Sequence, residues 1–182
     1  RGANGMAAMR MKNGFIQAFL VIMLFLAGNG LTGCAYFNTF YLTKKNFKDG
    51  ERVRKRSQDA NNPEMKKYYN AVIESGAIIL QDYKDSRYVD DSLFLMGMSY
   101  YHTRDFTRAR TKFDELLTAF PQSGFAEEAK YYRARSFMEI DRIDQARVDL
   151  SELTTLGNRA IQGQAGLTLA EINFRAGQWD EL

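Results

Sequence analysis

Apolar side chains recur at helical spacing along most of this 182-residue sequence. Between residues 36 and 56, aromatic side chains follow one another at spacings of three, four and seven positions, which predicts an amphipathic helix. Pro63 follows a run of turn-forming residues and is suited to the first position of a second helix. The pattern therefore predicts an all-α protein.

The pattern repeats itself beyond Pro63 with a step of 37 residues. This step places Gly97 on Ala134 and Phe106 on Ile143. Self-similarity at such a period is the signature of stacked supersecondary units. We expect helical hairpins over residues 63–182, with units at about 64–85, 86–122, 123–158 and 159–182, the last of them incomplete.

The unit at residues 86–122 resembles the tetratricopeptide repeat. The positions that carry the resemblance are Leu93, Met96, Gly97, Tyr100, Ala109, Phe113 and Pro121. The resemblance implies a TPR-type helical-hairpin solenoid, in which two antiparallel helices cross closely at Gly97 and Ala109. Two residues of the next unit depart from the pattern: Lys130 stands where an apolar residue is expected, and Asn158 replaces the proline.

A different pattern precedes the repeats. Residues 15–27 form an apolar run with one polar residue, and Arg10 and Lys12 stand just before it. This arrangement is typical of a secretory signal, and the run is shorter than the roughly 20 apolar residues of a membrane span. Directly behind it, Leu31, Thr32, Gly33 and Cys34 resemble the lipobox of bacterial lipoproteins.

The position of Cys34 at the foot of the signal favours lipidation over a buried or catalytic role. The lipobox resemblance implies a signal peptide over residues 1–33, a diacylglyceryl thioether on Cys34 and an acylated amine. Ala35 stands where an aspartate would retain the protein at the inner membrane, which favours the outer membrane. Because the chain starts with Arg1, we expect a fragment whose start codon is Met6, Met9 or Met11.

The net charge differs between the predicted signal peptide and the rest of the chain. The first 33 residues hold three basic and no acidic side chains, so the remaining chain carries 22 of each and is neutral. A nucleic-acid partner gains no support from this balance. Seven basic residues lie between Lys44 and Arg56, in a segment 34–62 that we expect to be a lipid-anchored helix and neck. They form either a solvated face or a surface held against anionic headgroups.

Residues that could carry a reaction are scarce. His102 is the one histidine of the chain, so a histidine-based metal cluster or a catalytic triad lacks its parts. Its position at a helix end favours a capping or surface role. The glycines are scattered singly rather than gathered in a phosphate loop. We expect no enzyme, no metal, no small-molecule substrate and no cofactor beyond the covalent lipid on Cys34.

Stacked hairpins present the first helix of each unit on a concave side. The repeat resemblance places these candidate groove residues there: Asp91, Phe94, Met98, Tyr101, His102, Glu128, Tyr131, Arg135, Met138, Glu139, Gln164, Leu167, Glu171, Phe174 and Arg175. Aromatic residues and methionines interleaved with charges suit an extended segment or helix of another protein. For Phe94, Tyr131 and Phe174, packing between neighbouring hairpins is an equal alternative.

The connection at residues 120–129 is similar to repeats in bacterial envelope lipoproteins of the BamD (YfiO) type and in YbgF-like periplasmic proteins. A lipobox followed at once by such repeats favours the BamD-like group. This implies an outer-membrane lipoprotein, facing the periplasm, that binds envelope proteins during β-barrel assembly. The alternatives are a YbgF (CpoB)-like coordinator of envelope division, a pilotin-like lipoprotein for secretin assembly and a peptidoglycan-active enzyme with a missing C-terminal domain.

Overall fold

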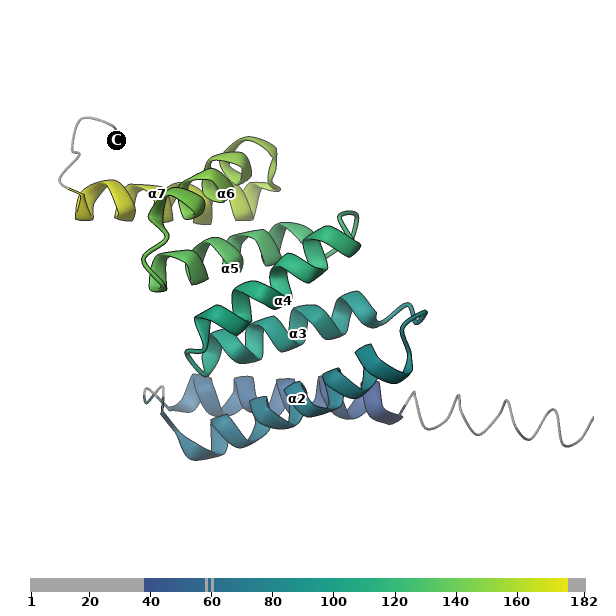
Figure 1. Cartoon of the computed structure of the whole chain (residues 1–182). Helices are drawn as coiled ribbons and strands as arrows, with labels where there is room; N and C mark the ends of the chain where they lie inside the picture. Colours follow the sequence, from purple (N-terminus) through teal and green to yellow (C-terminus); the bar gives the residue numbers. More distant parts are fainter. Residues whose placement is uncertain (1–37, 58, 60, 177–182) are drawn as a thin grey trace, which may run out of the picture. The chain divides into compact units, whose positions relative to one another are not determined.

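The computed structural model describes residues 38–57, 59 and 61–176, and within them the chain forms helices and no strand (Figure 1). Residues 38–56 are helical and are called the N-terminal helix below. The following elements are α2 (Pro63–Asp82), α3 (Val89–His102), α4 (Phe106–Ala119), α5 (Ala126–Glu139), α6 (Ile143–Leu156) and α7 (Arg159–Arg175). The all-α prediction is confirmed.

The predicted signal peptide, the lipobox and Cys34 lie outside the described residues. The described helices belong to one compact unit that begins at Thr39. None of these helices has both the length and the apolar character needed to cross a membrane.

Successive helices form hairpins that stack in series (Figure 1). Each of the helices α2 to α7 packs against its neighbours in sequence. In addition α3 contacts α5, and α5 contacts α7, whereas α2, α4 and α6 do not contact one another. The helices α3, α5 and α7 therefore line one side of the stack, which is where the repeat resemblance placed the candidate groove.

Close approach of the two helices in a hairpin depends on a residue without a side chain. A Cβ atom at Gly97 of α3 would lie 2.5 Å from the ring of Phe113 on α4. Phe113 and Ala109 have no exposed surface, so the ring has no free space to move into. Gly97 and Ala109 thus have the roles that the sequence predicted.

The 37-residue period is visible in the backbone and in buried hydrogen bonds. Arg104 and Asp141, one period apart, both have positive φ angles, of 64° and 58°, in the turns that join α3 to α4 and α5 to α6. Ser99 and Ser136, again one period apart, are fully buried. Each serine hydroxyl donates to the backbone carbonyl four residues earlier, so neither buried polar group lacks a partner.

The two departures from the repeat pattern have structural explanations. The ammonium group of Lys130 reaches Glu152 of α6 and forms an ion pair, while its aliphatic stem keeps the place of the expected apolar residue. The side chain of Asn158 accepts hydrogen bonds from the backbone N–H groups of Ala160 and Ile161 at 3.1 Å each. Asn158 therefore caps α7 at the position where a proline was expected.

The N-terminal helix packs against α2 as the first helix of a hairpin. The hydroxyl of Thr43 donates to Ser75 of α2 at 2.7 Å. A Cβ atom at Gly50 would lie 3.0 Å from the ring of Tyr69, a close approach like that of Gly97 and Phe113. The ring of Tyr69 is fully buried at this crossing.

The structure thus joins residues 38–56 to the hairpin stack, whereas the sequence placed them in a neck that precedes the repeats. The physical reason is the greater length of the first hairpin. Residues 57–62 link the N-terminal helix to α2, while three residues suffice between α3 and α4. The helix α2 also has 20 residues, against 14 in α4. Both differences shift the register, so the 37-residue step does not extend back to the N-terminal helix.

Candidate functional site

The predicted groove residues lie on α3, α5 and α7, five on each helix. The structure separates them into two sets. The buried set is Phe94, Met98 and Tyr131, which are at most 8% exposed. The half-buried or exposed set is Asp91, Tyr101, His102, Glu128, Arg135, Met138, Glu139, Gln164, Leu167, Glu171, Phe174 and Arg175. A partner can contact most of the second set without displacing the core.

The buried set holds neighbouring hairpins together. The ring of Phe94 stacks on Phe125 with centroids 4.6 Å apart, and Phe125 lies just before α5. The hydroxyl of Tyr131 on α5 forms a hydrogen bond with Thr168 of α7 at 3.2 Å. For Phe94 and Tyr131 the structure therefore favours packing between hairpins, whereas Phe174 is 57% exposed.

Three tyrosines and an arginine meet between α3 and α5. The ring of Tyr132 contacts Tyr101 edge-on at 5.1 Å and Tyr131 edge-on at 5.4 Å. One turn after Tyr131, the guanidinium of Arg135 donates to the Tyr131 hydroxyl at 3.4 Å. Burial raises the pKa of Tyr101 and of Tyr132, so both hydroxyls stay protonated at neutral pH. We call Tyr101, Tyr131, Tyr132 and Arg135 the tyrosine–arginine cluster.

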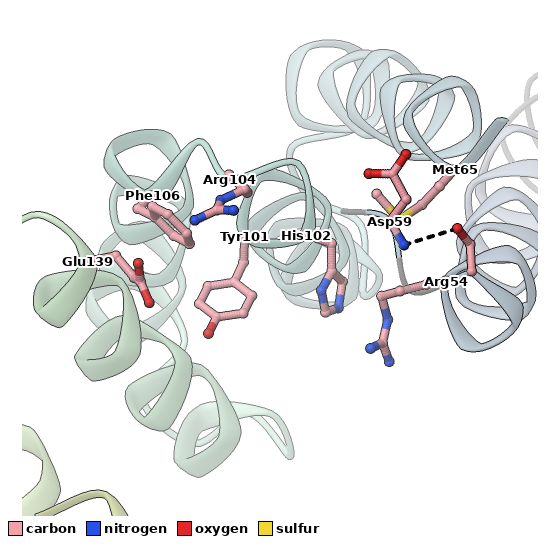
Figure 2. A pocket seen from close by; sticks show the side chains of 9 residues that line it. Arg54, Asp59, Met65, Tyr101, His102, Arg104, Phe106 and Glu139 are labelled. Atoms are coloured by element: carbon pink, nitrogen blue, oxygen red, sulfur yellow. Dashed lines mark hydrogen bonds between the residues drawn. The ribbon is translucent and has the colours of Figure 1, made fainter. Parts of the chain in front are cut away.

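A cavity of about 340 Å³ adjoins this cluster at the C-terminal end of α3 (Figure 2). Its lining residues are Arg54, Ser57, Asp59, Met65, Tyr101, His102, Arg104, Phe106 and Glu139. Figure 2 shows Tyr101 between Glu139 on one side and His102 on the other. The cavity thus combines cationic, anionic and aromatic groups, and its volume suits a side chain or a short peptide segment.

The cavity brings together Tyr101, His102 and Glu139, which the sequence had placed in the groove. Sequence reasoning missed Arg54 and Arg104. Arg104 lies in the turn that joins α3 to α4, and its place in the connection between two predicted helices was a usable signal for a surface cation. Arg54 comes from the N-terminal helix, and no sequence pattern placed that helix beside α3.

A polar network from the N-terminal helix lies next to the cavity. The Glu51 carboxylate accepts two hydrogen bonds from Arg54, at 2.9 and 2.7 Å, and one from the Tyr69 hydroxyl at 2.6 Å. His102 Nε2 lies 3.2 Å from Glu51 Oε1, a close approach without the alignment of a hydrogen bond. The His102 ring also stacks on Tyr69, with centroids 5.3 Å apart.

The predicted surface or capping role of His102 is wrong. Its side chain is 10% exposed, because the N-terminal helix and α2 cover it. Burial lowers the pKa of His102 to about 4, although the nearby Glu51 carboxylate opposes this shift, so the imidazole is neutral at pH 7. Burial alone would raise the pKa of Glu51, but the hydrogen bonds from Arg54 and Tyr69 outweigh it and hold that pKa below its usual value.

Within the described part of the chain, no group of three or more histidine, cysteine, aspartate or glutamate side chains is placed to hold a metal ion. The chemistry that the described site offers is recognition, through flat aromatic rings, tyrosine hydroxyls and guanidinium groups.

Comparison with known families agrees with the geometry of α3 and α4. Residues 91–123 match the family model of the tetratricopeptide repeat. This match covers 33 of the 182 residues. With the helical hairpins stacked on either side of it, the described chain is a tetratricopeptide-type helical solenoid. Such repeats generally act as protein–protein interaction scaffolds. No curated protein matches the chain.

Proposed function

We propose that this protein is an outer-membrane lipoprotein that faces the periplasm and binds other envelope proteins through the face formed by α3, α5 and α7. The most specific form of the proposal is a BamD-like role in the assembly of β-barrel outer-membrane proteins. The function is binding and positioning, without a reaction.

The observation that carries the proposal is the tyrosine–arginine cluster on the side of the stack that a tetratricopeptide repeat uses for binding. Tyrosine and arginine are enriched among the residues that dominate protein–protein affinity. The rings of Tyr101 and Tyr132 hold each other edge-on, so they lose little rotamer freedom when a partner binds. Arg135 and the cavity beside Tyr101 add charged contacts at the same place.

Replacing Tyr101 and Arg135 by alanine is expected to lower the affinity for the partner at least tenfold, because each truncation removes a contact of the hot-spot type. The measurement is a crosslinking pull-down from envelope membranes, followed by titration of the recovered partner. The matched control replaces Val148 and Arg142 by alanine, since both are exposed on or beside α6, away from the binding face.

The identity of the recovered protein tests the specific role. A barrel-assembly subunit that is lost with the Tyr101→Ala/Arg135→Ala variant and kept with the control is the expected result. Peptidoglycan synthases would instead point to a division coordinator, and a secretin would point to a pilotin-like protein. Equal losses in the variant and the control would contradict the assigned binding face.

The lipid anchor rests on the sequence Leu31-Thr32-Gly33-Cys34, which presents small residues before a thiol. Only a thiolate among these side chains is nucleophilic enough to take a diacylglyceryl group. Replacing Cys34 by serine is therefore expected to leave the protein unacylated and uncleaved, as seen by intact mass and by labelling with a radioactive fatty acid. A processed Cys34→Ser protein that still fractionates with outer membranes would refute the anchor.

A further inference from the structure

Charge is divided unevenly between the N-terminal helix and the rest of the described chain. Residues 38–56 carry seven basic and two acidic side chains, a net charge of +5. Residues 57–176 carry fifteen basic and eighteen acidic side chains, a net charge of −3. The neutral balance of the chain after residue 33 therefore conceals one strongly basic helix.

The basic side chains form a stripe on the outward side of this helix. The inward side is set by Phe40, Thr43 and Gly50, which are buried against α2 and the start of α3. On the outward side, exposed residues follow one another at alternating steps of four and three, which aligns them along one helix face. They are Tyr41, Lys45, Lys48, Arg52 and Lys55, and we call them the basic stripe.

Within the described residues, few acidic side chains neutralise the positive charges of this stripe. Arg52 pairs with Asp49 at 2.9 Å. None of the ion pairs that the structure shows among these residues includes Lys45, Lys48 or Lys55. Like charges one helical turn apart repel one another, so the stripe lowers helix stability unless an external anion lies against it.

We propose that the basic stripe lies against an anionic phospholipid surface. The stripe is straight and runs along a single helix, so a flat array of headgroups can meet all four of its cations at once. Its length from residue 41 to residue 55 is about 21 Å at the rise of an α-helix. Tyr41 is 58% exposed at one end of the stripe, and tyrosine is a side chain that favours the membrane–water interface.

This docking goes beyond the proposed scaffold role, because it orients the hairpin stack on the membrane. It does not depend on acylation of Cys34. Together with a tether at residue 34, a second contact along the helix would fix the direction in which α3, α5 and α7 present their binding face. A lipid chain alone, being flexible, would leave that direction open.

Vesicle binding by the full chain tests the proposal. In a Cys34→Ser background, vesicles of phosphatidylcholine are compared with vesicles of phosphatidylcholine and phosphatidylglycerol in equal parts. The preference is the ratio of the affinities for the two kinds of vesicle. In the Lys45→Gln/Lys48→Gln/Lys55→Gln variant this ratio is expected to fall about a hundredfold, because each lysine near an anionic surface contributes a factor of about five. Added salt should weaken the preference of the unaltered stripe.

The matched control is Lys84→Gln/Arg142→Gln/Arg159→Gln, which removes the same charge from exposed residues outside the N-terminal helix. The control is expected to keep the preference for anionic vesicles, since its basic stripe is intact. The apolar run and the first three basic residues are common to both variants, so whatever they add to vesicle binding is the same in both. Equal losses in both variants would show that only bulk charge matters and would overturn the proposal. Soluble polyglutamate that binds the stripe as tightly as the vesicles do would overturn it in favour of an acidic protein partner.

Discussion

Replacement of Phe113 by alanine is expected to lower the free energy of unfolding by about 3 to 5 kcal/mol. The ring of Phe113 is fully buried and fills the space where α3 and α4 cross. It contacts the rings of Phe94 and Tyr132, with centroids 6.2 and 6.4 Å away, so it also links two hairpins. Since helices hold these rings apart, the cavity left by the truncation cannot collapse fully. Urea unfolding followed by circular dichroism measures the loss.

Two further variants make the Phe113 result specific. Phe174→Ala removes an equally large ring that is 57% exposed, and it is expected to cost less than about 1 kcal/mol. Gly97→Ala places a methyl group against the Phe113 ring, which overpacks the crossing by about 1 to 3 kcal/mol. In the Phe113→Ala background, that cost is expected to vanish. If the costs of Gly97→Ala and Phe113→Ala simply add, the two residues do not share the contact described above.

The elements that the sequence predicted correctly are those set by local chemistry. Pro63 is the first residue of α2, with the Asn62 side chain as its cap. The 37-residue step placed Phe106 on Ile143, and these two residues are the first of α4 and α6. Gly97 lies at a helix crossing, as predicted, because two helices can approach this closely only where one of them has no side chain. Each of these residues lies at or beside the feature that it determines.

The candidate site depended on contacts between hairpins, and there the sequence was a weaker guide. Residues on one helix face were assigned to the groove by position in the repeat. That position does not tell whether a side chain points to solvent or toward the next hairpin, and Phe94 turned to the interior to stack on Phe125. Tyr132 was not predicted, because its exposure beside Tyr101 depends on how α5 is placed against α3.

The N-terminal helix shows the same limit on a larger scale. Its basic residues were evident in the sequence, but the residues that join it to the stack are polar or small. Glu51, Thr43 and Gly50 would be read as surface or helix-weakening residues in isolation. In the structure they meet Tyr69 and Ser75 of α2, eighteen or more residues away, and that contact also buries His102.

The burial of His102 leads to the second large expected effect, a loss of stability as the pH falls from 6.5 to 4. The unfolded chain takes up a proton on His102 near its ordinary pKa of about 6.5. The folded chain resists protonation until about pH 4, because burial lowers the pKa of His102. Between these values the unfolded state binds more protons, so the free energy of unfolding rises with pH across this window. The contribution of His102 is about 3 kcal/mol over the whole range.

A single histidine makes this effect separable from other titrations. Between pH 5 and 6.5 His102 is expected to contribute about 2 kcal/mol. Burial raises the pKa of Asp91 and of Glu128, so these two carboxyls act in the opposite direction, and their effect is common to the unaltered chain and to a variant at position 102. Glu51 acts in the same direction as His102 but later: because its pKa is lowered, its stabilising effect is lost as the pH falls below its ordinary value toward that lowered pKa. His102→Gln places a non-titrating amide beside Glu51, so the free energy of unfolding of this variant, measured with urea, should lack the rise of about 2 kcal/mol that His102 contributes between pH 5 and 6.5. A variant that keeps the slope of the unaltered chain would show that His102 is not held neutral against the N-terminal helix, and the packing of that helix on α3 would need revision.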